Sequence, residues 1–292
     1  MNIPDSILSP AERVELRLRK LFAESGYRRY RMARFEPYDF YSAHMGFLGG
    51  RILTFTDTDG RLMALKPDVT LSIIKNYRGG EEKVSYTEKV YRDIGSSGEF
   101  CEISEAGIER LGTVDEEAQR EVLALAKASL ELISPDHILD VAHIGYVAGL
   151  LKETKAKSAV KAELLKLVKT KNVGGVRSLG LDAGVSSVWE YLAELYGPAE
   201  SLSQALADMS LNGEMSAAAA ELAGVSAGAN VDFSIIRDMN YYNGLVFKGY
   251  VPGASGAVVS GGRYDGLVKS LGGKGGAIGF AVYLDSINGE EA

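Results

Sequence analysis

VDFSIIRDMNYYNGLVFKG, from Val231 to Gly249, is the stretch of sequence that decides the fold. Apolar and polar residues alternate on both sides of Asn243-Gly244, a dipeptide that readily supplies the positive φ angles of a tight turn. The stretch therefore predicts a hairpin of two strands that brings Arg237, Tyr241 and Tyr242 together. An arginine fork beside two tyrosines would suit a small anionic or zwitterionic ligand. Taken alone, the segment is explained equally well by half-buried tyrosines and an arginine on the surface.

The composition is that of an ordinary globular protein. The chain has 292 residues, 46% hydrophobic and 24% charged, which is enough for one large or two modest domains. The formal charge of −7 and the lack of a basic stripe argue against nucleic acid as a partner. The single cysteine, Cys101, excludes an intrachain disulfide and fits a reducing compartment. With neither a signal peptide nor a membrane-spanning apolar run, the sequence predicts a cytoplasmic location away from membranes.

The first third of the chain mixes helical and strand-like segments. A capping box at Ser9-Pro10-Ala11-Glu12 predicts a helix that runs to about Ser25. A second helix is expected to end at Tyr77, with Asp68 or Thr70 as its N-cap. Strands are expected at 27–35 and, as a hairpin around Asp57-Thr58-Asp59-Gly60, at 51–55 and 61–65.

Two longer strands are expected at 83–92 and 100–111, joined by a connection rich in glycine and serine. On the second strand, Glu105 and Glu109 share one face with Gly107, because side chains on a strand repeat with period two. Two carboxylates in line, opposite Arg92, would suit a ligand that carries an ammonium or imidazole group. A solvated sheet face is the simpler alternative.

The second half of the chain has three parts. A capping box at 113–116 predicts a long helix that ends at Ser134-Pro135, and 137–143 reads as a short strand. From about 145 to 228, Ala, Leu, Lys and Glu dominate, which predicts several short helices broken at Gly174-Gly175, Gly180, Gly197-Pro198 and Gly213. Strand character resumes at Asn230, and 276–284 reads as a buried strand. The order predicts an α+β fold around a mostly antiparallel sheet.

Motifs for a nucleophile, a metal or a bound cofactor are not evident. The three histidines, His44, His137 and His143, lack a metal-site spacing, and core or edge roles explain His137 and His143 better than ligation does. The sequence contains neither a G-x-S-x-G elbow nor a Walker-type loop. The glycine cluster LGGKGGAIG precedes a strand and does not match the dinucleotide fingerprint. We therefore expect neither a cofactor nor a metal.

Six segments, taken in order, make the sequence specific: KPDVT, VYRDIGSSGEF, EAGIERLG, IIRDMNYYNGLVF, SGGRYDGLVKSLGG and AIGFAVYLDSI. Together they resemble the catalytic core of histidyl-tRNA synthetase, a class II aminoacyl-tRNA synthetase. RDMNYYNG and SGGRYDGLVKSLGG are similar to the two histidine-specific signatures of that family. The resemblance covers nearly the whole chain and is weakest at 145–228. It implies one class II synthetase-like core domain over 1–292 with a helical insertion at about 145–228, usually dimeric, with the ligand pocket on the sheet.

The resemblance also implies which residues would bind histidine. Asp68 and Thr70 fall on the amino-group contacts, where the enzymes tend to have Glu and Thr, and Arg92 falls on the arginine of motif 2. Carboxylates would bind the ammonium and the ring N–H, while a tyrosine would pack against the ring and donate a hydrogen bond. The eight implied positions are Asp68, Thr70, Arg92, Glu105, Glu109, Arg237, Tyr241 and Tyr242.

Several departures separate the chain from a working synthetase. Asp93-Ile94 replaces the His-Glu that follows the motif 2 arginine, and Cys101 replaces the second arginine of that motif. Ser286 falls where the motif 3 arginine would clamp the ATP phosphates, so the main counter-charge for adenylyl transfer is lost. Ala33 replaces the motif 1 proline, and Asn240 stands where the signature usually has Asp. Because the sequence stops just past motif 3, we expect no anticodon-binding domain.

This pattern is similar to the regulatory subunits of ATP phosphoribosyltransferase, the first enzyme of histidine biosynthesis. The resemblance implies a subunit without catalysis, a short-form catalytic subunit as partner, L-histidine as feedback effector, and a homodimer within a hetero-oligomer. Histidine would occupy either the old synthetase pocket or a nearby interface. One alternative is a truncated synthetase-like enzyme that activates an amino acid for a non-tRNA acceptor, and Ser286 opposes it. The other is a structural partner without a ligand, which leaves the convergent charged residues unexplained.

Overall fold

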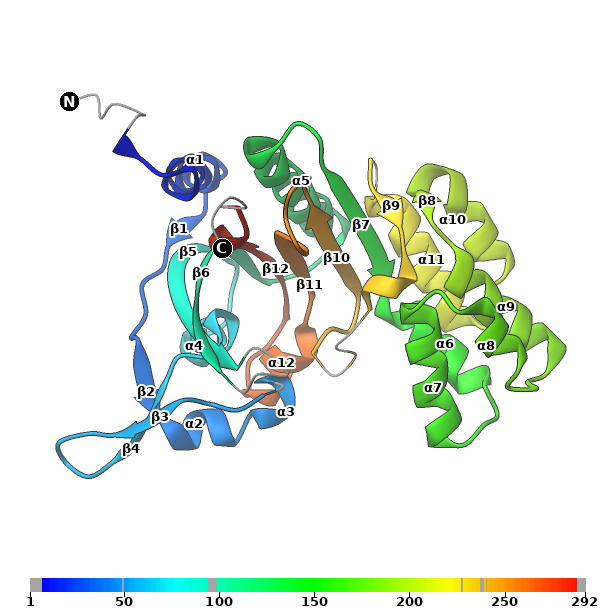
Figure 1. Cartoon of the computed structure of the whole chain (residues 1–292), viewed down its shortest axis with the longest axis horizontal. Helices are drawn as coiled ribbons and strands as arrows, with labels where there is room; N and C mark the ends of the chain where they lie inside the picture. Colours follow the sequence, from blue (N-terminus) through cyan, green and yellow to red (C-terminus); the bar gives the residue numbers. More distant parts are fainter. Residues whose placement is uncertain are drawn as a thin grey trace.

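The computed structural model describes residues 7–48, 50–93, 99–226, 228–236, 239 and 241–287. Within these ranges a nine-stranded sheet forms the centre of the protein (Figure 1). Its order across the sheet is β1 (Arg28–Arg29), β5 (Glu82–Asp93), β6 (Phe100–Gly112), β12 (Gly276–Tyr283), β11 (Val259–Arg263), β10 (Leu245–Tyr250), β7 (Ile138–His143), β9 (Asn230–Val231) and β8 (Gly197–Pro198). Neighbouring strands are antiparallel except for β1 with β5 and β7 with β9. The predicted α+β fold around a mostly antiparallel sheet is confirmed.

Two helices cover one face of this sheet. On α1 (Pro10–Glu24) the buried residues Val14, Leu18 and Phe22 recur every four positions, so one helical stripe packs into the core. The longer α5 (Glu116–Ile133) buries a similar stripe against the same face, where Ala106 and Ile108 of β6 point. The opposite face of β6 carries Glu105, Gly107 and Glu109. It is covered only in part, by α4 (Val69–Asn76) and α12 (Asp265–Ser270).

The helix starts test the predicted caps. The capping box of α1 is present, since Ser9 N donates to Glu12 Oε2 and Glu12 N donates to Ser9 Oγ. Asp68 is the N-cap of α4 and accepts from Leu71 N at 2.7 Å. The capping box predicted at 113–116 is wrong, because Asp115 is the cap of α5 and its side chain accepts from Ala118 N.

A second, three-stranded sheet is built from β2 (Phe35–Pro37), β4 (Leu62–Leu65) and β3 (Thr54–Thr56). The predicted hairpin of β3 and β4 is confirmed, and Asp57 Oδ1 holds its turn by accepting from Asp59 N and Arg61 N. The long strand expected at 27–35 is wrong, since only β1 and the start of β2 have strand geometry there. Two short helices, α2 (Tyr38–Ser42) and α3 (Met45–Leu48), follow β2.

Helices dominate between β7 and β9, beyond the last strands of the large sheet (Figure 1). Their core includes the fully buried Trp189, whose Nε1 donates to Thr154 Oγ1 at 2.8 Å. The break expected at Gly174-Gly175 is wrong, because Asn172 caps a short helix there by accepting from Gly175 N. We call this part the helical segment. It comprises α6 (Ile144–Glu153), α7 (Ser158–Lys169), α8 (Val173–Arg177), α9 (Ala183–Glu194), α10 (Ala199–Asp208) and α11 (Gly213–Val225).

The hairpin predicted around Asn243-Gly244 is wrong. Strand β7 lies between the two halves of that stretch, and Val141 pairs with Val231 on one side and with Phe247 on the other. After β9 the chain forms a 3₁₀ helix, η3 (Phe233–Ile235), and β10 pairs with β7 and β11. Gly244 has no positive φ, and its lack of a side chain instead admits Arg263, whose Cδ would lie 2.8 Å from a Cβ there. None of the described helices has the length and apolar character needed to cross a membrane.

Candidate functional site

A cavity of about 570 Å³ lies on the face of the large sheet that bears Glu105 and Glu109. Strands β5, β6, β12, β11 and β10 form its floor, and the start of α4, helix α3 and the segment before β10 form its rim. Seven of the eight residues expected at the site line this one cavity, and the eighth, Arg237, lies outside the described residues. The seven are Asp68, Thr70, Arg92, Glu105, Glu109, Tyr241 and Tyr242.

Glu109 is an almost fully buried acid of the cavity, with 2% of its surface exposed. Its Oε1 accepts a hydrogen bond from Thr70 Oγ1 at 2.6 Å, and its Oε2 accepts one from the hydroxyl of Tyr264. Burial raises the pKa of Glu109 to about 8, although both hydroxyls oppose the rise. The carboxyl is therefore held by neutral donors and retains a proton at neutral pH.

Glu105 lies one strand repeat away from Gly107 and is 1% exposed. Arg92 Nη1 is 3.0 Å from Glu105 Oε1, an ion pair rather than an aligned hydrogen bond. Burial raises the pKa of Glu105 to about 7 even though the arginine lowers it. Arg92 is shared, because its Nη2 lies 3.7 Å from Asp68 Oδ2 and its Nε donates to Pro67 O.

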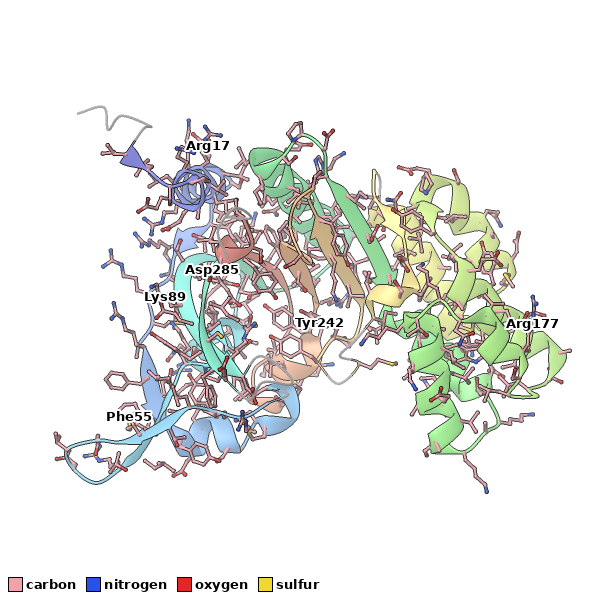
Figure 2. The ribbon with its side chains drawn as sticks, viewed as in Figure 1. Arg17, Phe55, Lys89, Arg177, Tyr242 and Asp285 are labelled. Carbon is pink, nitrogen blue, oxygen red and sulfur yellow. The ribbon has the colours of Figure 1, made fainter. Side chains whose placement is uncertain are left out.

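Aromatic rings enclose the cavity opposite these acids. The ring of Tyr241 lies 4.8 Å from that of Tyr242 and 5.7 Å from that of Tyr264, measured between centroids. Phe47 of α3 meets Tyr241 edge-on at 6.5 Å. Figure 2 places Tyr242 near β11 and α12. The rings form an apolar wall next to the carboxylates, which is the arrangement that small polar ligands occupy in pockets.

Glycines in the sheet keep the floor of the cavity open. A Cβ at Gly279 would lie 1.7 Å from Glu109 Oε2, and one at Gly107 would lie 2.5 Å from the hydroxyl of Tyr86. Any side chain at either position would displace the groups that face the cavity. The sequence reasoning placed Gly107 on the correct face. It missed Tyr86, Tyr264 and Gly279, for which the signals were glycines inside predicted strands and a tyrosine inside SGGRYDGL.

The charges of the cavity favour a ligand with cationic groups. Asp68, Glu105 and Glu109 provide three carboxyls, while the described lining residues contribute Arg92 and Lys248 as cations. A bound ammonium or imidazole N–H would satisfy a carboxyl that burial otherwise keeps protonated. Throughout the described ranges, no group of three or more His, Cys, Asp or Glu residues could hold a metal ion.

The structure describes some of the positions that depart from a synthetase, while Ile94 and Asn240 lie outside the described residues. Asp93 binds Arg51 Nε at 2.6 Å, and Cys101 pairs with Arg92 across the strands. Ser286 lies in η4 (Leu284–Ile287) and lines a different cavity, between α1 and the end of α5. The residue that takes the place of the motif 3 arginine therefore neither carries a positive charge nor faces the acidic pocket.

The family model described as histidyl-tRNA synthetase matches residues 6–287. The chain belongs to the histidyl-tRNA synthetase family. Among solved structures, an ATP phosphoribosyltransferase regulatory subunit/histidyl-tRNA synthetase from Bacillus halodurans C superposes with a TM-score of 0.84 at 23% identity, covering 100% of this chain and 84% of that chain. A chain of the ATP phosphoribosyl transferase (HisG:HisZ) complex from Thermotoga maritima gives 0.72 at 21% identity, covering 93% and 96%. Both likenesses confirm the class II synthetase-like fold.

Curated relatives of this family member carry the name ATP phosphoribosyltransferase regulatory subunit. The relative from Thermoanaerobacter sp. (strain X514) is 28% identical over 94% of this chain and 76% of its own length. The relative from Lactococcus lactis subsp. cremoris is also 28% identical, over 96% and 92%. These matches confirm the resemblance to regulatory subunits that the sequence motifs indicated.

Proposed function

We propose that this member of the histidyl-tRNA synthetase family is a non-catalytic regulatory subunit of ATP phosphoribosyltransferase. It assembles with a short-form catalytic subunit and binds histidine in the 570 Å³ cavity, and the bound amino acid inhibits the complex. The observation that carries the proposal is the pair of buried acids, Glu105 and Glu109, in a chain that has Cys101 and Ser286 where a synthetase has arginines. The names of the relatives support the assembly, since one similar structure is itself a phosphoribosyl transferase complex.

The cavity offers a partner for each polar group of histidine. Glu109, which lines the cavity and is held by Thr70 and Tyr264, would accept a hydrogen bond from the ring N–H, because each carboxylate oxygen has a second lone pair. Glu105 and Asp68 would bind the ammonium beside Arg92. Arg237, at the place of the signature arginine, is the proposed partner of the carboxylate. A ligand whose side chain has no N–H donor would leave Glu109 protonated and would gain no charge-assisted hydrogen bond there, so the site would favour histidine.

Catalysis of its own is disfavoured by the same geometry. Adenylate formation needs cations arranged around the ATP phosphates. Here Asp93 binds Arg51 and Ser286 faces another cavity. The runner-up, an enzyme that activates an amino acid for a non-tRNA acceptor, would have to place its phosphate-binding cations elsewhere. We therefore propose that the chain is a sensor of histidine. It would derive from a synthetase core of one domain into which the helical segment is inserted.

A homodimer within the larger assembly is part of the proposal. On the small sheet, Phe35 is paired with Leu65 and Phe55 with Met63, so all four side chains point to one face. Phe35 is 50% exposed and Phe55 38% exposed, and their rings meet edge to face at 5.5 Å. A second copy of the chain would cover this apolar face. Because the one cysteine, Cys101, is a free thiol, we place the complex in the cytoplasm.

The test is co-purification with a short-form catalytic subunit, followed by assays of phosphoribosyl transfer with increasing histidine. A stable complex whose activity falls with histidine is expected. Pyrophosphate exchange with ATP and histidine is measured on the chain alone. Robust exchange would overturn the regulatory reading in favour of the activating enzyme, and failure to assemble with the catalytic subunit would remove the proposed partner.

A further inference from the structure

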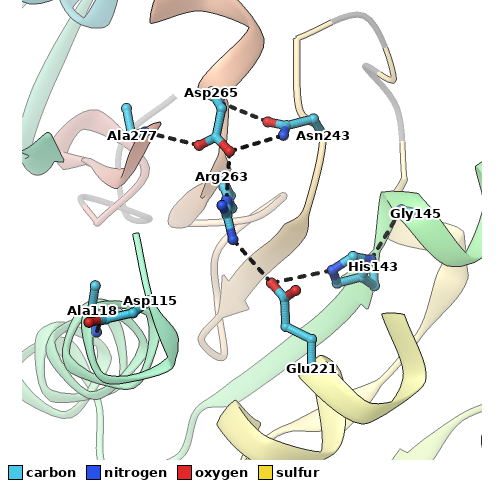
Figure 3. A network of polar contacts seen from close by, with 9 residues as sticks. All are labelled: Asp115, Ala118, His143, Gly145, Glu221, Asn243, Arg263, Asp265 and Ala277. Atoms are coloured by element: carbon cyan, nitrogen blue, oxygen red, sulfur yellow. Dashed lines mark hydrogen bonds and ion pairs between the residues drawn. The ribbon is translucent and has the colours of Figure 1, made fainter. Parts of the chain in front are cut away.

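A charged contact joins the helical segment to the sheet next to the cavity (Figure 3). Glu221 lies on α11, and its Oε1 is 3.5 Å from both Arg263 Nη1 and His143 Nε2. His143 Nδ1 accepts from Gly145 N at 3.1 Å, so the proton of the neutral ring is on Nε2, facing Glu221. His143, the last residue of β7, thus also caps the start of α6. Its partner Glu221 lies within α11, so the contact joins regular secondary structure on both sides.

The same arginine continues the network toward the cavity. Arg263 Nε donates to Asp265 Oδ2 at 2.9 Å, and Asp265 Oδ1 accepts from Ala277 N in β12. Asp265 N donates to Asn243 Oδ1 at 2.8 Å, and Asn243 Nδ2 returns a bond to Asp265 Oδ2 at 3.3 Å. All of these contacts appear in Figure 3. Asn243 is therefore clamped in two directions, directly after the two tyrosines of the aromatic wall.

The three residues Arg263, Tyr264 and Asp265 divide between the network and the cavity. Tyr264 is fully buried and donates to Glu109, while its two neighbours hold Glu221 and Asn243. Gly262, one residue earlier, lies so close to Tyr242 that a Cβ there would be 2.7 Å from its ring. We call Tyr241 and Tyr242 the tyrosine wall. A ligand that contacts both Glu109 and the tyrosine wall therefore acts on the backbone of residues 262–264, through Tyr264 at one end and Gly262 at the other.

We propose that the network of Glu221, Arg263, Asp265 and Asn243 positions the tyrosine wall and couples occupancy of the cavity to the helical segment. Glu221 is a positioning residue in this scheme, because it acts on the ligand only through Arg263. The proposal rests on the proposed function, in which the ligand is histidine. Coupling is reciprocal: if histidine tightens the network, a tightened network must raise the affinity for histidine.

The alternative is that Glu221 only attaches α11 to the sheet. The helix offers a matched control, since Glu214 also lies on α11 and forms an ion pair with Lys152 of α6. Both acids are partly exposed, at 29% and 38%. Glu221→Gln and Glu214→Gln remove the same charge from the same helix, but only the first interrupts the network.

The experiment measures histidine binding by calorimetry and amide hydrogen exchange of residues 213–225 with and without histidine. We expect Glu221→Gln to weaken binding by about fivefold or more, the usual scale of coupling between sites. Glu214→Gln is expected to stay within about twofold, as for an exposed ion pair. Histidine should slow exchange across α11 in the unmodified protein and in the control variant, and should fail to do so in Glu221→Gln.

Two further variants extend the test, and the first keeps the proposal open to refutation if Glu221→Gln folds poorly. Asn243→Ala changes an exposed residue at the other end of the network, and it should weaken histidine binding to a similar degree. Glu221→Gln combined with Arg263→Gln should weaken binding no more than the worse single variant, because the two act as a unit. Equal affinities for all variants would overturn the inference while the proposed function stands. Absence of histidine binding in the unmodified protein would overturn both.

Discussion

Thr70 and Glu109 are 39 residues apart in the chain, yet Thr70 Oγ1 donates a 2.6 Å hydrogen bond to Glu109 Oε1. Thr70 occupies the first turn of α4, where Asp68 is the cap, and Glu109 points from the middle of β6. The bond thus joins the start of a helix to the floor of the cavity. It orients one carboxylate oxygen and leaves the acid without a described cationic partner, which makes Glu109 the residue most sensitive to what enters the cavity.

Replacing Glu109 with glutamine should show how much of the histidine affinity depends on the charge of Glu109 and how much on the shape of the cavity. Glu109→Gln keeps the volume and one acceptor but loses the charge that a cationic ligand would satisfy. Since hydrogen bonds to charged groups contribute about 1.5–3 kcal/mol, histidine affinity should fall by about 10- to 100-fold in calorimetry. Glu102→Gln on the same strand is the control, because Glu102 is exposed and bonds Lys89 and Tyr91 away from the cavity. Equal affinities for the two variants would rule out Glu109 as a contact.

The two buried acids should make the stability of the unliganded protein depend on pH. Burial raises the pKa of Glu109 to about 8 and that of Glu105 to about 7, from an ordinary value of 4.5. Between pH 4.5 and 8 the folded state therefore binds more protons than the unfolded state, and the free energy of unfolding falls as the pH rises. The contribution is complete below pH 4.5 and lost as the pH passes 8.

This dependence can be measured by urea unfolding of the unmodified protein and of Glu109→Gln from pH 5 to 9. The variant should be more stable at pH 9, and the difference should shrink toward pH 5. We therefore expect Glu109→Gln to gain stability and to lose affinity for histidine, as is common when a binding residue is replaced. A difference that stays constant with pH would show that Glu109 is ionised in the folded protein.

A methyl group at Gly279 should close the floor of the cavity. In Gly279→Ala the new Cβ would lie 1.7 Å from Glu109 Oε2 and 2.3 Å from Ile108 O, so the backbone of β12 must shift. Overpacking of this kind costs about 1–3 kcal/mol, which urea unfolding would detect together with loss of histidine binding. Gly266→Ala in α12 is the control, since nothing lies within 4 Å of a Cβ there. If the free energy of unfolding of Gly279→Ala were unchanged, β12 and β6 would have to move apart at little cost in free energy.

Local patterns in the sequence placed two acidic residues of the cavity on one strand face. The period of two fixed Glu105, Gly107 and Glu109 on one face. The pairing of β5 with β6 put Arg92 opposite Cys101, where it forms an ion pair with Glu105. The capping box at Ser9 and the Asp68 cap also followed from residues within one helical turn. Each of these features depends on neighbours close in the chain, so sequence alone could define it.

What the sequence missed depends on strand order and on side chains that meet over long separations. Asn243-Gly244 reads as a hairpin turn, but β7, about a hundred residues earlier, lies between the halves, and Asn243 bonds Asp265 instead. Tyr264, at the start of α12, enters the site because its hydroxyl reaches Glu109 of β6, two strands away from β11. Such contacts are decided by how the sheet is assembled, and propensities within a window of a few residues do not contain that information.

The apolar face of the small sheet predicts how the chain associates with itself. Phe35, Phe55, Met63 and Leu65 share that face through their register, while the other face is closed by the buried Ala64 and by Glu36, which binds Lys75 of α4. Figure 2 shows Phe55 at the outer side of the molecule, away from the cavity. Because the inner face is already packed, the exposed rings remain for a partner.

Phe55→Asp should therefore convert a homodimer into a monomer in sedimentation velocity at micromolar concentration. A buried, unpaired carboxylate costs several kcal/mol, and that is enough to raise a dissociation constant by about a thousandfold. Leu211→Asp is the matched control, since Leu211 is similarly exposed, at 42% against 38%, but lies between α10 and α11. The control should remain dimeric with the same melting temperature. If both variants sediment as the unmodified chain does, the second copy binds elsewhere and this face is left for the catalytic subunit.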